Sequence, residues 1–95
     1  MMHRLKKIVE QVWDEAMGGQ EYAMCALNVK DEDRSLAEAY FSMANQELTH
    51  AETLMVHASR IAQADENIRA IWDWEHEKVM KQIAKAKTML DMYRK

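Results

Sequence analysis

The chain has 95 residues, enough for one domain. Its 13 basic and 16 acidic side chains give a formal charge of −3, so we expect no general affinity for nucleic acid. No apolar run approaches the roughly 18 residues of a membrane span, and the first residues lack the apolar stretch of a signal peptide. One cysteine, Cys25, excludes a disulfide within the chain. We therefore expect a cytoplasmic protein that binds neither nucleic acid nor membranes.

The composition favours helices throughout. The chain has no proline and two glycines, the residue types that most disfavour a helix interior. The sequence predicts a single all-α domain over residues 1–95, with helices over about 3–30, 34–64 and 67–93. The first two form an antiparallel hairpin around the acidic turn at 31–33, and the third helix follows it. A chain this short buries only about two thirds of its extended surface, so we expect a homodimer or a higher homo-oligomer.

Two adjacent glycines, Gly18 and Gly19, stand inside the first helical segment. Each costs a helix interior about 1 kcal/mol relative to alanine. They indicate a kink, a break, or a place where another helix packs closely. The sequence leaves all three alternatives open.

The second helix carries a regular row of residues at alternating spacings of four and three. Such spacing places residues on one helix face, the face that meets a partner. Its centre is expected to be apolar, because a buried carboxylate is costly unless it is paired or binds a metal. Yet charged and titratable residues stand there. The full row is Leu36, Tyr40, Met43, Glu47, His50, Leu54, His57 and Ile61.

Glu47 and His50 are three residues apart, so on a helix they lie about 5–6 Å apart on one face and both side chains can reach one metal ion. Antiparallel packing brings Glu21 of the first helix to within about one helical turn of Glu47 in height. Glu21, Glu47 and His50 are therefore the predicted metal ligands and catalytic residues. The alternatives are a hydrogen-bonded core pair for Glu47 and His50, a boundary position for Glu21 with its carboxylate in solvent, and Gln20 in place of Glu21 as the inward residue.

Two further residues are weaker metal candidates. His57 lies two turns beyond His50 on the same face, where it is a secondary ligand or a histidine at the rim of the core. Glu75 falls on the apolar stripe of the third helix, where it binds metal in transit, pairs with His57, or stays partly solvated. Oxygen and imidazole ligands with negative charge suit Fe(II), Mn(II) or Zn(II) rather than Cu(I).

These three main ligands are half of a recurring set. Di-iron carboxylate bundles take one glutamate from each of two helices and a Glu-x-x-His pair from each of the other two. Two copies of this chain, related by a two-fold axis, supply that whole set. Dimerisation then completes the metal site as well as the core.

On these residues the sequence resembles the ferritin-like superfamily, especially its half-size branch, best known from the encapsulated ferritins. The likeness covers residues 20–61, through Glu21-Tyr22-x-x-x-Ala26 and a run that contains Glu47-Leu48-x-His50. It implies that two chains pair into a four-helix bundle with a di-iron ferroxidase centre between subunits, two irons per dimer. Glu47 would bridge the irons, with Glu21 and His50 as outer ligands. The implied activity is oxidation of Fe(II) by dioxygen or peroxide, for iron storage or detoxification.

The same resemblance implies a capsid-like compartment as a partner, although residues 89–95 contain nothing similar to the address peptide of encapsulated ferritins. A hypothesis from another class is a non-catalytic helical assembly or adaptor module, in which Glu47 and His50 form a structural pair. Titration with Fe(II) separates the two hypotheses.

Overall fold

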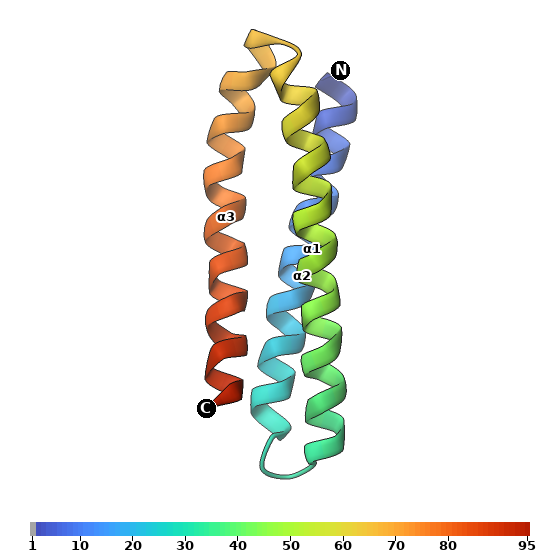
Figure 1. Ribbon diagram of the computed structural model, residues 1–95, viewed down its shortest axis with the longest axis vertical. Coiled ribbons are helices and arrows are strands. Elements are labelled where there is room, and N and C mark those ends of the chain that lie inside the picture. Colours follow the sequence, from blue (N-terminus) through green and yellow to red (C-terminus); the bar gives the residue numbers. More distant parts are fainter. Residues whose placement is uncertain (1) are drawn as a thin grey trace.

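The computed structural model describes residues 2–95, which form three helices joined by two short turns (Figure 1). The helices are α1 (Met2–Val29), α2 (Arg34–Gln63) and α3 (Glu66–Arg94). The all-α prediction is confirmed over these residues, and each predicted helix bound differs from the observed one by at most one residue. The helices run up and down beside one another, so the Cα atoms extend over 51 × 17 × 14 Å. None of the described helices is long and apolar enough to cross a membrane.

An aspartate precedes both α2 and α3 at the two acidic turns. The side chain of Asp33 accepts a hydrogen bond from the backbone N–H of Leu36, and that of Asp65 accepts one from the backbone N–H of Asn67. Such an acceptor satisfies one of the free N–H groups at the start of a helix. The acidic residues in the turns therefore determine where α2 and α3 begin.

Small residues line the contact between α1 and α2. On α2 they are buried at every seventh position, Ala37, Ala44, Ala51 and Ala58. On α1 the buried small residues are Ala16, Gly19, Ala23 and Ala26. A Cβ atom on Gly19 would lie 2.8 Å from Cδ2 of Leu48, closer than two carbon atoms approach. Because α1 is one uninterrupted helix, the glycine pair does not break it and marks a close helix contact.

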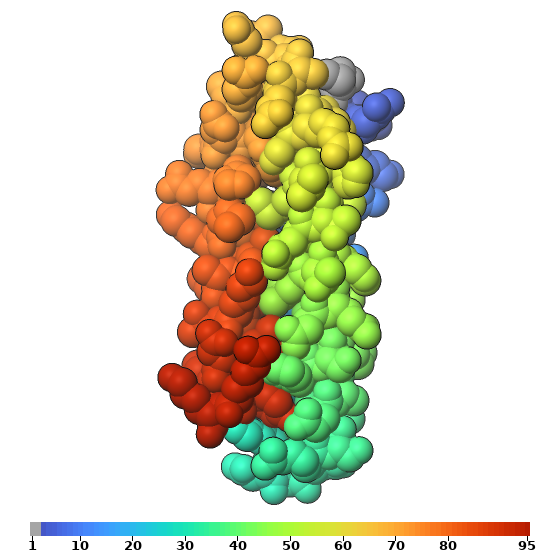
Figure 2. Space-filling model, viewed as in Figure 1, coloured from blue at the N-terminus to red at the C-terminus, as the bar shows by residue number. Residues whose placement is uncertain are grey.

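Larger side chains join α3 to this hairpin. The buried apolar residues of α3 are Ile68, Trp72, Val79, Ile83, Ala86, Leu90 and Tyr93. Midway along the helix, the buried side chain of Gln82 donates a hydrogen bond to the side-chain oxygen of Gln20 on α1. Near its end, the ring of Tyr93 stacks on Phe41 of α2, with 4.8 Å between the centroids. Figure 2 shows α2 and α3 side by side, covering one face of the molecule.

The row of α2 that was predicted to face a partner helix is not the buried row of this chain. Leu36 and Met43 are 41% and 37% exposed, and His50 is exposed as well. The buried row follows one residue later at each position, from Ala37 to Ala62. The predicted row therefore lies at the edge of the α1–α2 contact: Tyr40, Leu54 and Ile61 are half-buried there, whereas Leu36 and Met43 are exposed.

Candidate metal centre

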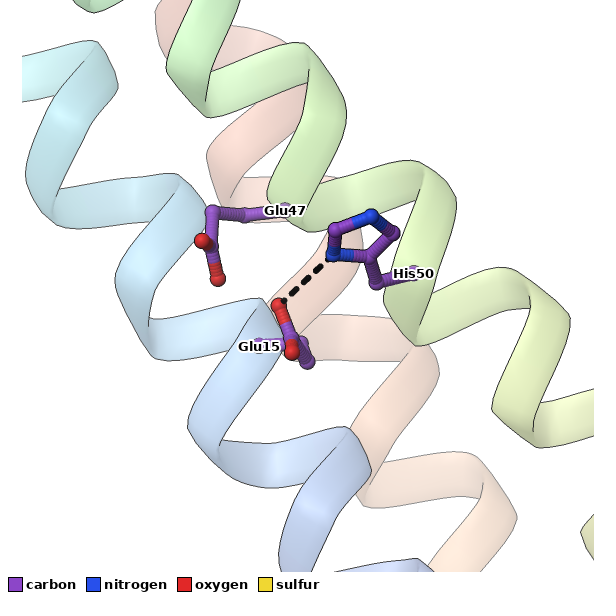
Figure 3. A group of neighbouring side chains, drawn as sticks. All are labelled: Glu15, Glu47 and His50. Atoms are coloured by element: carbon purple, nitrogen blue, oxygen red, sulfur yellow. Dashed lines mark ion pairs between the residues drawn. The ribbon is translucent and has the colours of Figure 1, made fainter.

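Three side chains converge about halfway along the α1–α2 hairpin (Figure 3). They are Glu15 of α1, and Glu47 and His50 of α2, and one potential ligand atom of each lies within 4.8 Å of the others. Nδ1 of His50 is 3.4 Å from Oε2 of Glu15. In Figure 3, α3 passes behind the hairpin, and no α3 residue belongs to the group in the part of the chain that is described. The group therefore opens on the side of the hairpin that α3 leaves uncovered.

The position of these side chains follows from the close contact between α1 and α2. Glu47 and His50 lie one helical turn apart, so both emerge on the same side of α2. The Glu47 side chain reaches across to α1, where Gly18 has no side chain in its way. A Cβ atom on Gly18 would lie 3.1 Å from Oε2 of Glu47. Glu15 stands one turn before Gly18 on α1 and meets both α2 residues from the opposite side.

The two carboxyl groups disturb each other. A hydrogen bond with Glu15 raises the pKa of Glu47 above its ordinary value, burial and the negative charge of Glu15 raise it further, and His50 lowers it. Oε2 of Glu15 is itself buried and has no hydrogen-bond partner among the described residues. Two carboxylates this close need a shared proton or a cation between them.

The chemistry of the three residues fits a divalent transition metal. Carboxylate oxygens and an imidazole nitrogen are ligands for Fe(II), Mn(II) and Zn(II), and the buried Oε2 of Glu15, which has no hydrogen-bond partner among the described residues, faces the other two groups. Such metals take about four to six ligands. The His50 side chain is 61% exposed and that of Glu15 28%, so the open side leaves room for ligands from water, from a substrate or from a second chain.

The predicted main residues divide into two groups. Glu47 and His50 lie together, as the sequence indicated. Glu21 is exposed on α1 and is not a member of the group; Glu15, six residues earlier, is the α1 residue beside Glu47. The alternative inward residue, Gln20, faces α3 and not the group, since it binds Gln82.

The two weaker candidates lie elsewhere. His57 is exposed on α2, and Glu75 is half-buried on α3. Glu75 lines an apolar groove between α1 and α3, beside Trp13 and Trp72. Neither residue belongs to a group of three potential metal ligands within residues 2–95.

Comparison with known proteins gives no family for the chain: no family model matches it, and no curated protein and no solved structure matches it either. The case for a function therefore rests on the Glu15–Glu47–His50 group and on the open helix face around it.

Proposed function

We propose that this protein binds Fe(II) at the Glu15–Glu47–His50 group and oxidises it there, as an assembly of at least two copies. The observation that carries the proposal is the convergence of three potential ligands: Oε2 of Glu15 is buried and has no hydrogen-bond partner among the described residues, and it lies beside a second carboxyl group and 3.4 Å from the imidazole of His50. Ionised carboxylates at this distance repel each other, and a divalent cation between them removes the repulsion. Mn(II) and Zn(II) are alternative metals for the same ligands.

A second copy completes the proposed centre. One glutamate from α1 and a Glu-x-x-His pair from α2 are half of the di-iron carboxylate set. The exposed Leu36 and Met43 stand on the same row of α2 as Glu47 and His50, so a second hairpin packed against this row covers apolar surface and adds the missing ligands. In the proposed homodimer, α1 and α2 of both copies form a ferritin-like four-helix bundle, and each α3 lies outside it.

Fe(II) is the substrate of this centre. Two Fe(II) ions lose one electron each, and one dioxygen molecule takes up both electrons and two protons and leaves as hydrogen peroxide. The residues of this chain bind and orient the metal ions: the Glu15 and Glu47 carboxylates balance their charge, and His50 binds through a neutral imidazole nitrogen. Iron storage and iron detoxification are the two uses that this reaction serves.

Anaerobic titration with Fe(II), followed by exposure to air, tests the proposal. We expect one iron per chain, and a rise in near-ultraviolet absorbance from Fe(III) once air is admitted. Glu15→Gln, Glu47→Gln and His50→Gln should each lose most of the binding. Glu21→Gln is the matched control, since it removes an exposed α1 carboxylate outside the group and should bind iron as the unchanged protein does. Loss of binding in Glu21→Gln but not in Glu15→Gln would transfer the ligand role to Glu21.

The second candidate function is a helical assembly or adaptor module without metal. The ion pair between Glu15 and His50, at 3.4 Å, favours it, because such a pair ties α1 to α2 by itself. On this hypothesis Fe(II), Mn(II) and Zn(II) do not bind, and Glu15→Gln and His50→Gln lower the melting temperature of the protein. Metal binding with the expected stoichiometry would exclude it.

A further inference from the structure

We propose that Gly18 is a positioning residue of the metal centre: because it lacks a side chain, the Glu47 carboxylate can lie against α1, beside Glu15. This inference rests on the proposed function, since it concerns the same three ligands. It assigns to one glycine of the Gly18–Gly19 pair a role that helix packing does not require.

The geometry at Gly18 singles out one neighbour. A Cβ atom there would lie 3.1 Å from Oε2, 3.5 Å from Cδ and 3.8 Å from Cγ of Glu47. All three nearest atoms therefore belong to the carboxyl end of a single side chain, and the shortest distance is to a proposed ligand oxygen. A methyl group at this point forces that oxygen to move by a few tenths of an ångström.

A displacement of this size is small for packing but large for a metal site. The ligand atoms of Glu15, Glu47 and His50 lie within 4.8 Å of one another, so a shift of one oxygen changes its distance to both others. Metal–ligand distances vary by only about 0.2 Å around their preferred values. Alanine at position 18 should therefore disturb metal binding before it disturbs the fold.

Gly19 makes a different contact. Its Cβ atom would lie 2.8 Å from Cδ2 and 2.9 Å from Cγ of Leu48, a residue that is 3% exposed in the core. Neither glycine has a positive φ, so the helical backbone accepts alanine at both positions and only the neighbours decide the outcome. Gly19 thus serves the packing of α1 on α2, and Gly18 serves the carboxylate.

Gly18→Ala and Gly19→Ala should have opposite effects on the stability of the metal-free protein. Alanine is more favourable than glycine in a helix interior, and the Glu47 side chain is half-buried and free to move outward. Gly18→Ala should therefore keep or raise the melting temperature while it weakens metal binding. Gly19→Ala should lower the melting temperature, because the contact would be shorter, at 2.8 Å, and Leu48 is a buried residue of the core.

Co(II) titration of the full chain tests the inference, because its visible absorption bands report the ligand geometry. For Gly18→Ala we expect about a tenfold loss of Co(II) affinity, typical of residues that support metal ligands, a changed band shape, and an undiminished melting temperature. For Gly19→Ala we expect a lower melting temperature and the band shape of the unchanged protein. Unchanged affinity and band shape in Gly18→Ala would overturn the assignment.

A shorter ligand provides a rescue experiment. In Glu47→Asp the carboxylate is drawn back from Gly18, so adding Gly18→Ala should cause little further loss of Co(II) affinity; such non-additivity is the mark of two coupled residues. Equal losses in both backgrounds would show that Gly18 does not act through Glu47. If the unchanged protein binds neither Co(II) nor Fe(II), the proposed function and this inference both fail. If it binds them and Gly18→Ala binds equally well, only this inference fails.

Discussion

The two contacts that α1 makes differ in the size of the side chains that form them. Toward α2 it presents alanine and glycine, which let the two backbones approach closely, whereas the groove between α1 and α3 is lined by larger side chains, among them Trp13 of α1 and Trp72 of α3. Facing helices at close range allow short polar side chains from both to meet, and the Glu15–Glu47–His50 group lies at the close contact. The contact with α3 contains apolar side chains and the hydrogen-bonded amide pair of Gln20 and Gln82. The Glu15–Glu47–His50 group and the Gln20–Gln82 pair thus lie on different sides of α1.

The largest expected effect comes from breaking the α3 contact. Trp72 is 5% exposed, and removal of a buried aromatic side chain costs about 3–5 kcal/mol. Trp72→Ala should therefore lower the free energy of unfolding by about that amount, as measured by urea denaturation. Since α3 gives no residue to the metal group, the folded variant should still bind Co(II) with unchanged affinity.

Trp74 is the matched control for this comparison. It is 60% exposed two residues further along α3, and an exposed substitution usually stays within about 0.5 kcal/mol. A loss in Trp74→Ala as large as that in Trp72→Ala would show that α3 does not pack as described.

Metal binding should stabilise the protein through the α1–α2 contact, where the three proposed ligands lie. A ligand that binds the folded state alone stabilises it by about 2.7 kcal/mol when its concentration is a hundred times the dissociation constant. Co(II) at that concentration should raise the unfolding free energy of the unchanged protein and of Trp72→Ala by similar amounts. It should have no effect on Glu15→Gln, and thermal unfolding with and without chelator measures the difference.

The same measurement bears on the assembly. If the second copy supplies ligands, metal binding and dimerisation are linked, and light scattering should show that chelator shifts the population toward monomer. A monomer that binds one metal ion tightly would contradict the shared centre while leaving the three ligands in place.

A larger side chain between α1 and α2 should lower both the free energy of unfolding and the affinity for metal. Ala44 is fully buried beside Gly19, and extra methylene groups in a packed core cost about 1–3 kcal/mol. Ala44→Leu should lose about that much stability and also bind Co(II) more weakly in its folded form, because the helices that hold the ligands move apart. Ala39→Leu, on the exposed side of α2, is the control. Unchanged Co(II) affinity in Ala44→Leu would separate the metal group from the close packing.

The fold could be predicted from the sequence because helix signals are local. The acidic turns and the near absence of helix-breaking residues determine where α2 and α3 begin and end. The buried row of α2 was harder to identify. The row of Leu36 and Met43 has the larger apolar side chains, whereas alanines are buried only because α1 opposes them with its own small residues. Such pairing depends on both helices at once.

Glu15 was missed for a related reason. The register of α1 against α2 depends on the turn between them. The observed turn places Glu15 beside Glu47. Glu21 stands six residues, or about 9 Å, further along α1. A signal was present in the sequence: if Gly18 and Gly19 mark the closest approach of α2, then Glu15 lies one turn away on the same side. Glu47 and His50 could be predicted to lie together because residues three positions apart on one helix share a face, whatever the register between helices.

The smallest effect is a pH dependence that involves Glu47. Its pKa in the folded protein is raised above the value of 4.5 that applies to the unfolded chain, first by the hydrogen bond with Glu15 and then by burial. The folded state therefore holds this proton more tightly, so its contribution to stability is complete below pH 4.5 and is lost as pH rises through the raised pKa.

Glu47→Gln keeps a donor for Glu15 but cannot ionise. In the absence of metal, its free energy of unfolding should equal that of the unchanged protein at low pH. At pH about 7 it should be higher than that of the unchanged protein, because there the Glu47 carboxyl group beside Glu15 has lost its proton. Urea midpoints from acid to neutral pH measure the difference, and Glu21→Gln, outside the group, should stay within about 0.5 kcal/mol throughout. A Glu47→Gln protein that is less stable than the original at neutral pH would mean that the ionised carboxylate holds α1 and α2 together, as the structural-pair hypothesis requires.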